Sequence, residues 1–149
     1  MKRYIGTKII EAEPLTLGDY NLYRGGQIPA DEDPTEKGYL VKYSDGYESW
    51  SPLKQFEEAY RRCDNMPFGL AIEAMKKGKK VARIGWNGKN QYIQLATGIS
   101  YKTAAGKIIN CEHEAIGNKA IAFVGTSGVQ MGWLASQADM LADDWVIVE

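Results

Sequence analysis

The chain has 149 residues, of which 44% are hydrophobic and 25% are charged, and these values are ordinary for a globular protein. The formal net charge of -1 excludes the overall basic excess that is typical of nucleic-acid-binding proteins. No apolar run reaches the roughly 20 residues that a membrane-spanning helix needs, and no apolar signal core follows the basic N-terminus, so we expect an intracellular protein without a membrane partner.

The first part of the chain contains signals for short strands and one short helix. Loose alternation of apolar residues over 2–12 predicts one or two strands. Thr16 and Asp19 have the spacing of a capping box and predict a helix over about 17–24. Residues 27–38 carry two prolines and several acidic residues, which is typical of a loop.

A β-hairpin is predicted next, because residues 39–43 and 47–50 flank a turn that ends in Gly46. Ser51 then has the character of a helix N-cap, and Pro52 suits the first helical position, where a missing N–H costs nothing. We therefore expect a strand-rich lobe that closes with a short helix.

A second domain is expected over residues 65–149, after a first lobe over residues 1–64. It opens with apolar residues at helical spacing, and Gly78 ends that helix. The residues on the apolar face are Phe68, Ala71, Ile72 and Met75. A strand over 80–84, a turn and a returning strand over 91–95 follow.

The middle of the second domain predicts further strands. Residues 99–103 and 107–110 flank a small turn, 111–118 have the character of a loop, and 120–124 are apolar enough for a strand. The glycine-containing turn over 125–128 offers backbone N–H groups to a phosphate, but it lacks the lysine and hydroxyl ending of a P-loop.

The end of the chain carries a short helix and an apolar strand. Ser136 and Asp139 have capping-box spacing at the start of the helix, and residues 144–148 predict a final buried strand. The predicted elements together indicate an α+β fold in which short helices pack on a mostly antiparallel sheet.

Catalytic and metal-binding patterns are weak. Cys63 and Cys111 form no Cys-x-x-Cys pair, and the ligand-like run over 111–114 is too short for all of its side chains to reach one ion. His113 is the only histidine, which argues against a Ser-His or Cys-His hydrolase. We expect no metal, no cofactor and no enzymatic activity.

Candidate binding residues occur in two stretches. Arg83 lies on a predicted apolar strand, where a charge needs an anion or a carboxylate as partner. Trp86 falls in a turn rich in Gly and Asn, where a large ring is less easily buried. Ser136 and Asp139 are explained by capping alone, whereas the neighbouring Gln137 has no capping duty. Polar groups beside aromatic rings suit a flat polar ligand such as a nucleobase or ribose.

These stretches carry a family resemblance. Residues 66–89, from Met66-Pro67-Phe68 to Trp86-Asn87-Gly88-Lys89, resemble the opening of the second Thoeris anti-defence family, and residues 132–145 are similar to its closing motif. The resemblance implies a non-enzymatic phage sponge, acting in the cytoplasm of the infected host, that holds glycocyclic ADP-ribose signals made by bacterial TIR proteins. Some members are implicated in holding cyclic dinucleotides, as in CBASS-type signalling. Residues 1–64 lie outside this resemblance and are similar to leader segments on other phage proteins.

The resemblance also implies a homotetramer with ligand pockets between protomers. We expect such a pocket to be lined by Phe68, Arg83, Trp86, Asn87, Trp133, Ser136, Gln137 and Asp139. Stacking on Trp86 or Trp133 and a diphosphate contact from Arg83 suit the implied ligand. Two alternatives stand beside it: a protein-interaction module that uses the aromatic hairpin 39–50, and a metal-dependent nucleotide hydrolase that uses Asp139 or Glu112.

Overall fold

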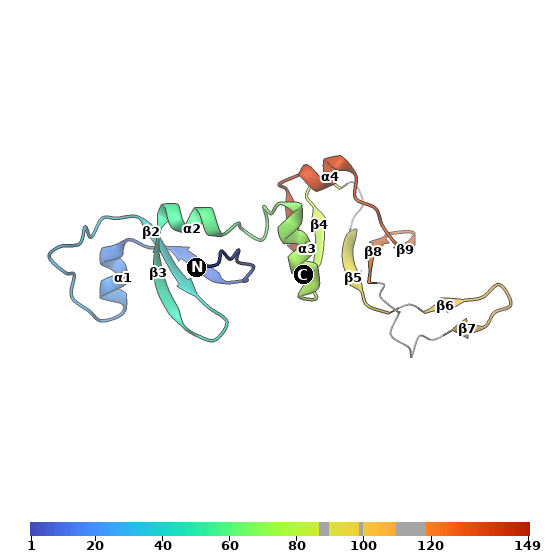
Figure 1. Ribbon diagram of the computed structural model, residues 1–149, viewed down its shortest axis with the longest axis horizontal. Helices are drawn as coiled ribbons and strands as arrows, with labels where there is room; N and C mark the ends of the chain where they lie inside the picture. The colour runs from blue at the N-terminus through green and yellow to red at the C-terminus, as the bar shows by residue number, and fades with distance from the viewer. Residues whose placement is uncertain (87–89, 99, 110–118) are drawn as a thin grey trace. The chain divides into compact units, whose positions relative to one another are not determined.

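The computed structural model describes residues 1–86, 90–98, 100–109 and 119–149. Its contacts divide the chain into two compact units, Met1–Arg61 and Arg62–Glu149. Each unit combines short helices with antiparallel strands, so the expected α+β class is confirmed (Figure 1). None of the helices in the described residues is long and apolar enough to cross a membrane.

The first unit is built on a three-stranded antiparallel sheet with the order β1-β2-β3. The strands are β1 (Glu11–Pro14), β2 (Gly38–Lys42) and β3 (Glu48–Pro52). The predicted hairpin is confirmed, since Gly46 has a φ of 87° in the turn between β2 and β3. Leu40 and Val41 of β2 are buried and form the centre of this unit.

Two helices complete the first unit, α1 (Leu17–Tyr23) and α2 (Leu53–Ala59). The predicted α1 cap is confirmed, because the Thr16 side chain accepts a hydrogen bond from the backbone N–H of Asp19. Phe56 of α2 stacks on Tyr39 of β2, with ring centroids 3.9 Å apart, and this contact holds the helix against the strand.

Two local predictions for this unit are wrong. The strand expected over 2–12 is replaced by β1 at Glu11–Pro14, because the residues up to Ile9 are exposed and no strand among the described residues pairs with them. Ser51 does not cap α2, since it pairs with Tyr39 inside the sheet and Pro52 occupies the cap position. Pairing with β2 therefore takes precedence over the local capping preference of Ser51.

The second unit has a five-stranded antiparallel sheet with the order β10-β4-β5-β8-β9. Its strands are β4 (Lys80–Arg83), β5 (Tyr92–Ala96), β8 (Ala120–Gly125), β9 (Gly128–Met131) and β10 (Trp145–Val148). The short strands β6 (Tyr101–Lys102) and β7 (Ile108–Ile109) form a separate hairpin. The loop predicted over 111–118 lies outside the described residues.

Helix α3 (Phe68–Lys76) packs along β10 and β4, and Figure 1 shows it beside β4. It ends as predicted, because Gly78 takes a φ of 85° immediately after its last turn. Apolar side chains from the helix and the sheet form one core: Met66, Ala71, Ala74, Met75, Val81, Ile93 and Trp145. The short helix α4 (Gln137–Leu141) then leads back to the sheet through β10.

Candidate functional site

Four aromatic rings from separate parts of the sequence meet in the second unit. Trp145 lies at their centre, fully buried, with its ring 5.4 Å from that of Trp86 and 6.3 Å from that of Trp133. Phe68 of α3 approaches Trp145 at 5.1 Å, and Trp86 meets Trp133 at 6.0 Å. The three tryptophan rings cross one another at 70–80°, which is the edge-to-face arrangement that aromatic pairs favour, whereas Phe68 is tilted by 38° against Trp145. We call Phe68, Trp86, Trp133 and Trp145 the aromatic cluster.

The half-buried ring of Trp86 contributes to the core, although the sequence placed it in a turn where burial seemed difficult. Besides the other tryptophans, it meets Phe123 of β8 at 5.5 Å. Trp133 is also half-buried, so each of these two rings keeps part of its surface accessible. They can therefore stabilise the fold and still present an aromatic surface to a ligand.

An ion-pair network lies next to the aromatic cluster. The Arg83 Nη1 atom is 2.9 Å from Asp139 Oδ1, and Arg83 Nε is 2.9 Å from Asp144 Oδ1. A further bond of 3.4 Å runs from Arg83 Nη2 to Asp144 Oδ2, so Asp144 accepts along one edge of the guanidinium plane. The sequence required an anion or a carboxylate near Arg83, and the structure supplies two carboxylates.

The network shifts the pKa values of Arg83 and Asp139. Hydrogen bonds to Asp144 and then to Asp139 raise the pKa of Arg83, which stays charged. Burial acts to raise the pKa of Asp139, but hydrogen bonds from Ser136 and Arg83 outweigh it, so the pKa lies below the ordinary value of 3.8. Both aspartate oxygens are engaged, because Oδ2 accepts from the Ser136 backbone N–H and hydroxyl.

Helix α4 connects the ion pairs to the aromatic rings. Ser136 and Asp139 form a complete capping box, in which each side chain accepts a hydrogen bond from the other's backbone N–H. The indole N–H of Trp145 donates to the backbone carbonyl of Asp139 at 2.9 Å. Asp139 therefore joins the cap, the ion pair and the buried tryptophan in one short turn.

The structure brings most of the sequence-predicted residues into one neighbourhood of a single protomer. The connected residues are Phe68, Trp86, Trp133, Arg83, Ser136 and Asp139. Gln137 is exposed at the first position of α4. Asn87 lies outside the described residues, as do Glu112, His113 and the rest of the 111–114 run.

Two residues of this neighbourhood were not among the predicted set, Asp144 and Trp145. The sequence assigned both to the final strand without a role in the site. The feature that brings them to the site is a long-range strand pairing. Strand β10 pairs with β4, and the register places Trp145 opposite Arg83. Only knowledge of that strand pairing reveals that an Asp-Trp pair at the start of β10 meets an arginine at the end of β4.

Other candidate features have simpler roles. The glycine-containing turn over 125–128 connects β8 to β9, with Gly125 paired to Gly128 as in a tight hairpin. Within the described residues, no group of three or more His, Cys, Asp or Glu side chains is placed to hold a metal ion. The aromatic cluster and its ion pairs remain the main candidate site.

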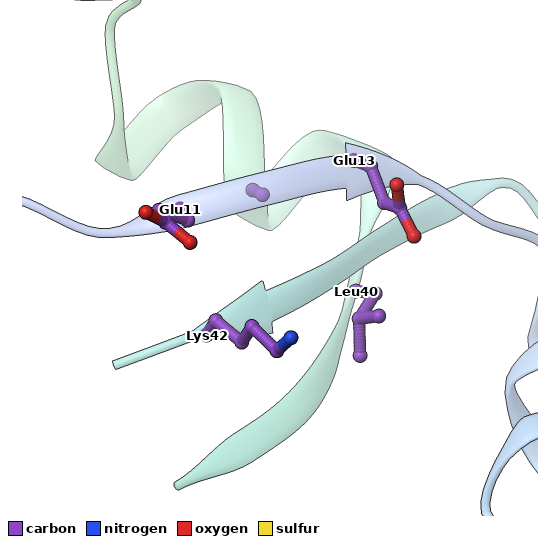
Figure 2. Close-up of a pocket in the computed structure, with 5 residues that line it drawn as sticks. Glu11, Glu13, Leu40 and Lys42 are labelled. Atoms are coloured by element: carbon purple, nitrogen blue, oxygen red, sulfur yellow. The ribbon is translucent and has the colours of Figure 1, made fainter. Parts of the chain in front are cut away.

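A surface hollow of about 280 Å³ lies on the first unit and not at this site. Its lining residues are Glu11, Ala12, Glu13, Leu40 and Lys42 (Figure 2). The lining contains two glutamates and one lysine. The lysine, Lys42, already forms an ion pair with Glu48, with 3.4 Å between Nζ and Oε1, so negative charge is in excess. Such a surface repels phosphate groups and does not suit a nucleotide.

Comparison with known proteins places the match in the second unit. The model of the Thoeris anti-defense 2-like domain matches residues 66–148. The protein "Thoeris anti-defense 2" of Bacillus phage SP01 is 40% identical over 88 residues, which cover 56% of this chain and 94% of that protein. Both the aromatic cluster and the ion-pair network lie inside the matched region, whereas the first unit lies outside it.

Proposed function

This chain belongs to the Thoeris anti-defense 2-like family, and from that premise we propose that it is a phage protein that sequesters a cyclic nucleotide immune signal. The ligand is of the glycocyclic ADP-ribose type, and cyclic dinucleotides are a second class to test. Sequestration would prevent activation of a Thoeris-type or CBASS-type effector in the host cytoplasm. The observation that carries the proposal is the match over 94% of an anti-defense protein.

The aromatic surface of the site suits a nucleobase. Stacking of a base on an aromatic side chain contributes about 1–3 kcal/mol, and Trp86 and Trp133 each keep part of their surface accessible. Gln137 is exposed next to the capping box and offers an amide to a base edge or a ribose hydroxyl. We also propose that Asn87, the next residue after Trp86 in the sequence, contributes to the same site.

Arg83 contributes in a more restricted way than a free arginine would. Its bonds to Asp139 and Asp144 use three of its five N–H groups, which leaves two to donate to a phosphate or ribose oxygen. The two carboxylates also outweigh its single positive charge. We therefore propose that Arg83 mainly orients the Ser136–Asp139 turn, and that base stacking provides more of the affinity than attraction between charges.

We propose binding without cleavage. A hydrolase that used Asp139 as a base or metal ligand would need a carboxylate oxygen directed at the substrate, but Arg83 and Ser136 engage both of its oxygens. Tight retention at nanomolar concentration requires about -12 kcal/mol of binding free energy. We propose that the protein is a homo-oligomer, a tetramer in the simplest case, in which ligands lie between protomers and bury enough surface to reach that value.

The experiment that tests this function is recovery of ligand from purified protein. The full chain is incubated with glycocyclic ADP-ribose, freed of unbound ligand and denatured by heat, and the released small molecules are identified by mass spectrometry. We expect intact ligand in stoichiometric amount. A cleaved product would establish an enzyme instead, and the absence of retained ligand with any cyclic nucleotide tested would refute sequestration.

A further inference from the structure

The five-stranded sheet of the second unit has one covered edge and one open edge. On the outer side of β10, Met66 and Trp145 exchange backbone hydrogen bonds of 2.8 and 3.0 Å, and Ile147 N–H donates to the Cys63 carbonyl at 2.8 Å. The segment before α3 therefore covers that edge. At the other end of the sheet, β9 pairs only with β8 among the described strands.

The backbone of β9 directs specific groups to this open edge. Gly132 lies opposite Ile121 in the continued register, and its N–H donates to the Ile121 carbonyl at 3.0 Å. Bonded and non-bonded positions alternate along an antiparallel pair, so Gln130 also bonds toward β8. The N–H and C=O groups of Val129 and Met131 consequently point away from β8, toward the outside of the sheet.

The side chains around this edge do not protect it against pairing with another strand. Natural edge strands are usually protected by charged residues, proline or a covering segment. The sequence has no charged residue and no proline from Gly125 to Ala138. Apolar side chains are exposed along it: Val129 at 63%, Met131 at 45% and Leu134 at 88%.

The open edge of the first unit, by contrast, is protected by a proline and by charged residues. Leu15 N–H donates to Gly38 O at 3.0 Å, so the same alternation directs the backbone of Ala12 and Pro14 outward from β1. Pro14 has no N–H to offer, and Glu11 and Glu13 place like charges along the strand. The contrast indicates that the exposed edge of β9 serves an interaction.

We propose that β9 pairs antiparallel with β9 of a second copy of the chain, about a two-fold axis at Gln130. Val129 of each copy then exchanges backbone hydrogen bonds with Met131 of the other, which satisfies the outward groups identified above. A second copy fits because the strand carries no charge, so two identical edges meet without repulsion. A two-fold contact of this kind closes on itself and leaves neither β9 edge exposed.

The register has a consequence for the candidate site. An axis at Gln130 places the Thr126–Ser127 turn of the second copy beyond Met131, where the chain leaves β9 at Gly132 and continues to Trp133. The second copy would thus supply hydroxyl and backbone N–H groups next to the aromatic cluster, as a ligand pocket between protomers requires. This consequence rests on the proposed function, whereas the pairing itself does not.

The test measures the mass of the full chain in solution by size-exclusion chromatography with light scattering, over a range of concentrations. Val129→Pro removes an outward N–H and no hydrogen bond to β8, and Met131→Lys brings like charges together near the axis. We expect each variant to halve the mass of the wild-type oligomer. Ala12→Pro is the matched control on the open edge of β1 and should leave the mass unchanged.

Circular dichroism establishes which variants fold. If Val129→Pro does not fold, Met131→Lys alone tests the pairing through β9. Folded variants that keep the wild-type mass would overturn pairing through β9, while the homo-oligomer proposal would stand. A wild-type chain that stays monomeric at every concentration would overturn both. Ligand recovery from the same samples reports on sequestration separately, so a failure of the pairing is distinguishable from a failure of the proposed function.

Discussion

Trp50 in the first unit and Trp145 in the second use the same anchoring contact in different surroundings. Each indole N–H donates to a backbone carbonyl outside its own strand, that of Leu15 at 2.8 Å for Trp50 and that of Asp139 at 2.9 Å for Trp145. Trp50 is half-buried and its ring lies over Gly38, whereas Trp145 is fully buried among other aromatic rings. Trp50 packs where Gly38 has no side chain, whereas Trp145 packs against the side chains of other aromatic residues.

The difference indicates what each unit is built to do. Around Trp50 the packing joins a small sheet to the segment that precedes α1. Around Trp145 the packing also positions Trp86, Trp133 and the ion-paired Asp139, so the anchor of the fold is the floor of the candidate site. Loss of Trp145 should therefore affect both stability and binding, while changes at Trp50 should affect the first unit alone.

Replacement of Trp145 by alanine should have the largest effect. Removing a fully buried tryptophan costs about 3–5 kcal/mol of unfolding free energy, and the Asp139 carbonyl also loses its donor. We expect hydrogen–deuterium exchange to increase throughout Arg62–Glu149 and to change little in Met1–Arg61. Trp145→Phe keeps an aromatic ring and should lower the free energy of unfolding by less than Trp145→Ala. Equal loss of protection in both units would contradict their independence.

A smaller loss is expected when Gly38 is replaced by alanine. The added methyl group would overlap the ring of Trp50 and the carbonyl of Ser51, and such overpacking typically costs about 1–3 kcal/mol. Thermal denaturation should show a lower midpoint for the first unit, with ligand retention unchanged. Gly69→Ala is the matched control, because a methyl group there meets nothing within 4 Å. An unaffected first unit would mean that both the Trp50 ring and the Ser51 backbone can shift at no cost.

Acid should weaken the second unit through Asp139. Its pKa is lowered in the folded state, so the carboxylate contributes stability that is present above the unfolded value of 3.8 and is lost as the pH falls through the lower folded value. Asp139→Asn should therefore reduce the difference in unfolding midpoint between neutral and strongly acidic solution. An identical acid response in wild type and Asp139→Asn would exclude this ion pair as a source of pH dependence.

The smallest effect on stability is expected for Gln137→Ala, which should alter the free energy of unfolding by less than about 0.5 kcal/mol. Its side chain is exposed and caps no helix, so any fall in ligand retention would come from a lost contact. Trp86→Ala cannot separate the two effects as cleanly, because its ring packs on Phe123 and on two tryptophans. Unchanged retention in Gln137→Ala would place the ligand elsewhere.

Features that depend on a few neighbouring residues could be read directly from the sequence. Examples are the Thr16 cap of α1, the Gly46 turn, the Gly78 end of α3 and the capping box at Ser136. Each depends on a glycine that tolerates positive φ or on a side chain that reaches a backbone group nearby in the chain. Local geometry is the same in any fold, so such predictions do not require the tertiary structure.

Only the tertiary structure decided the features that need distant partners. No local signal indicates that Arg83 meets Asp144, 61 residues later, or that β10 lies next to β4. The strand expected over 2–12 did not form there because a strand needs a neighbour, and Ser51 joined a sheet because β2 was available beside it. Strand order and long-range packing depend on the free energy of the whole unit, and that is why one fully buried tryptophan became the centre of the candidate site.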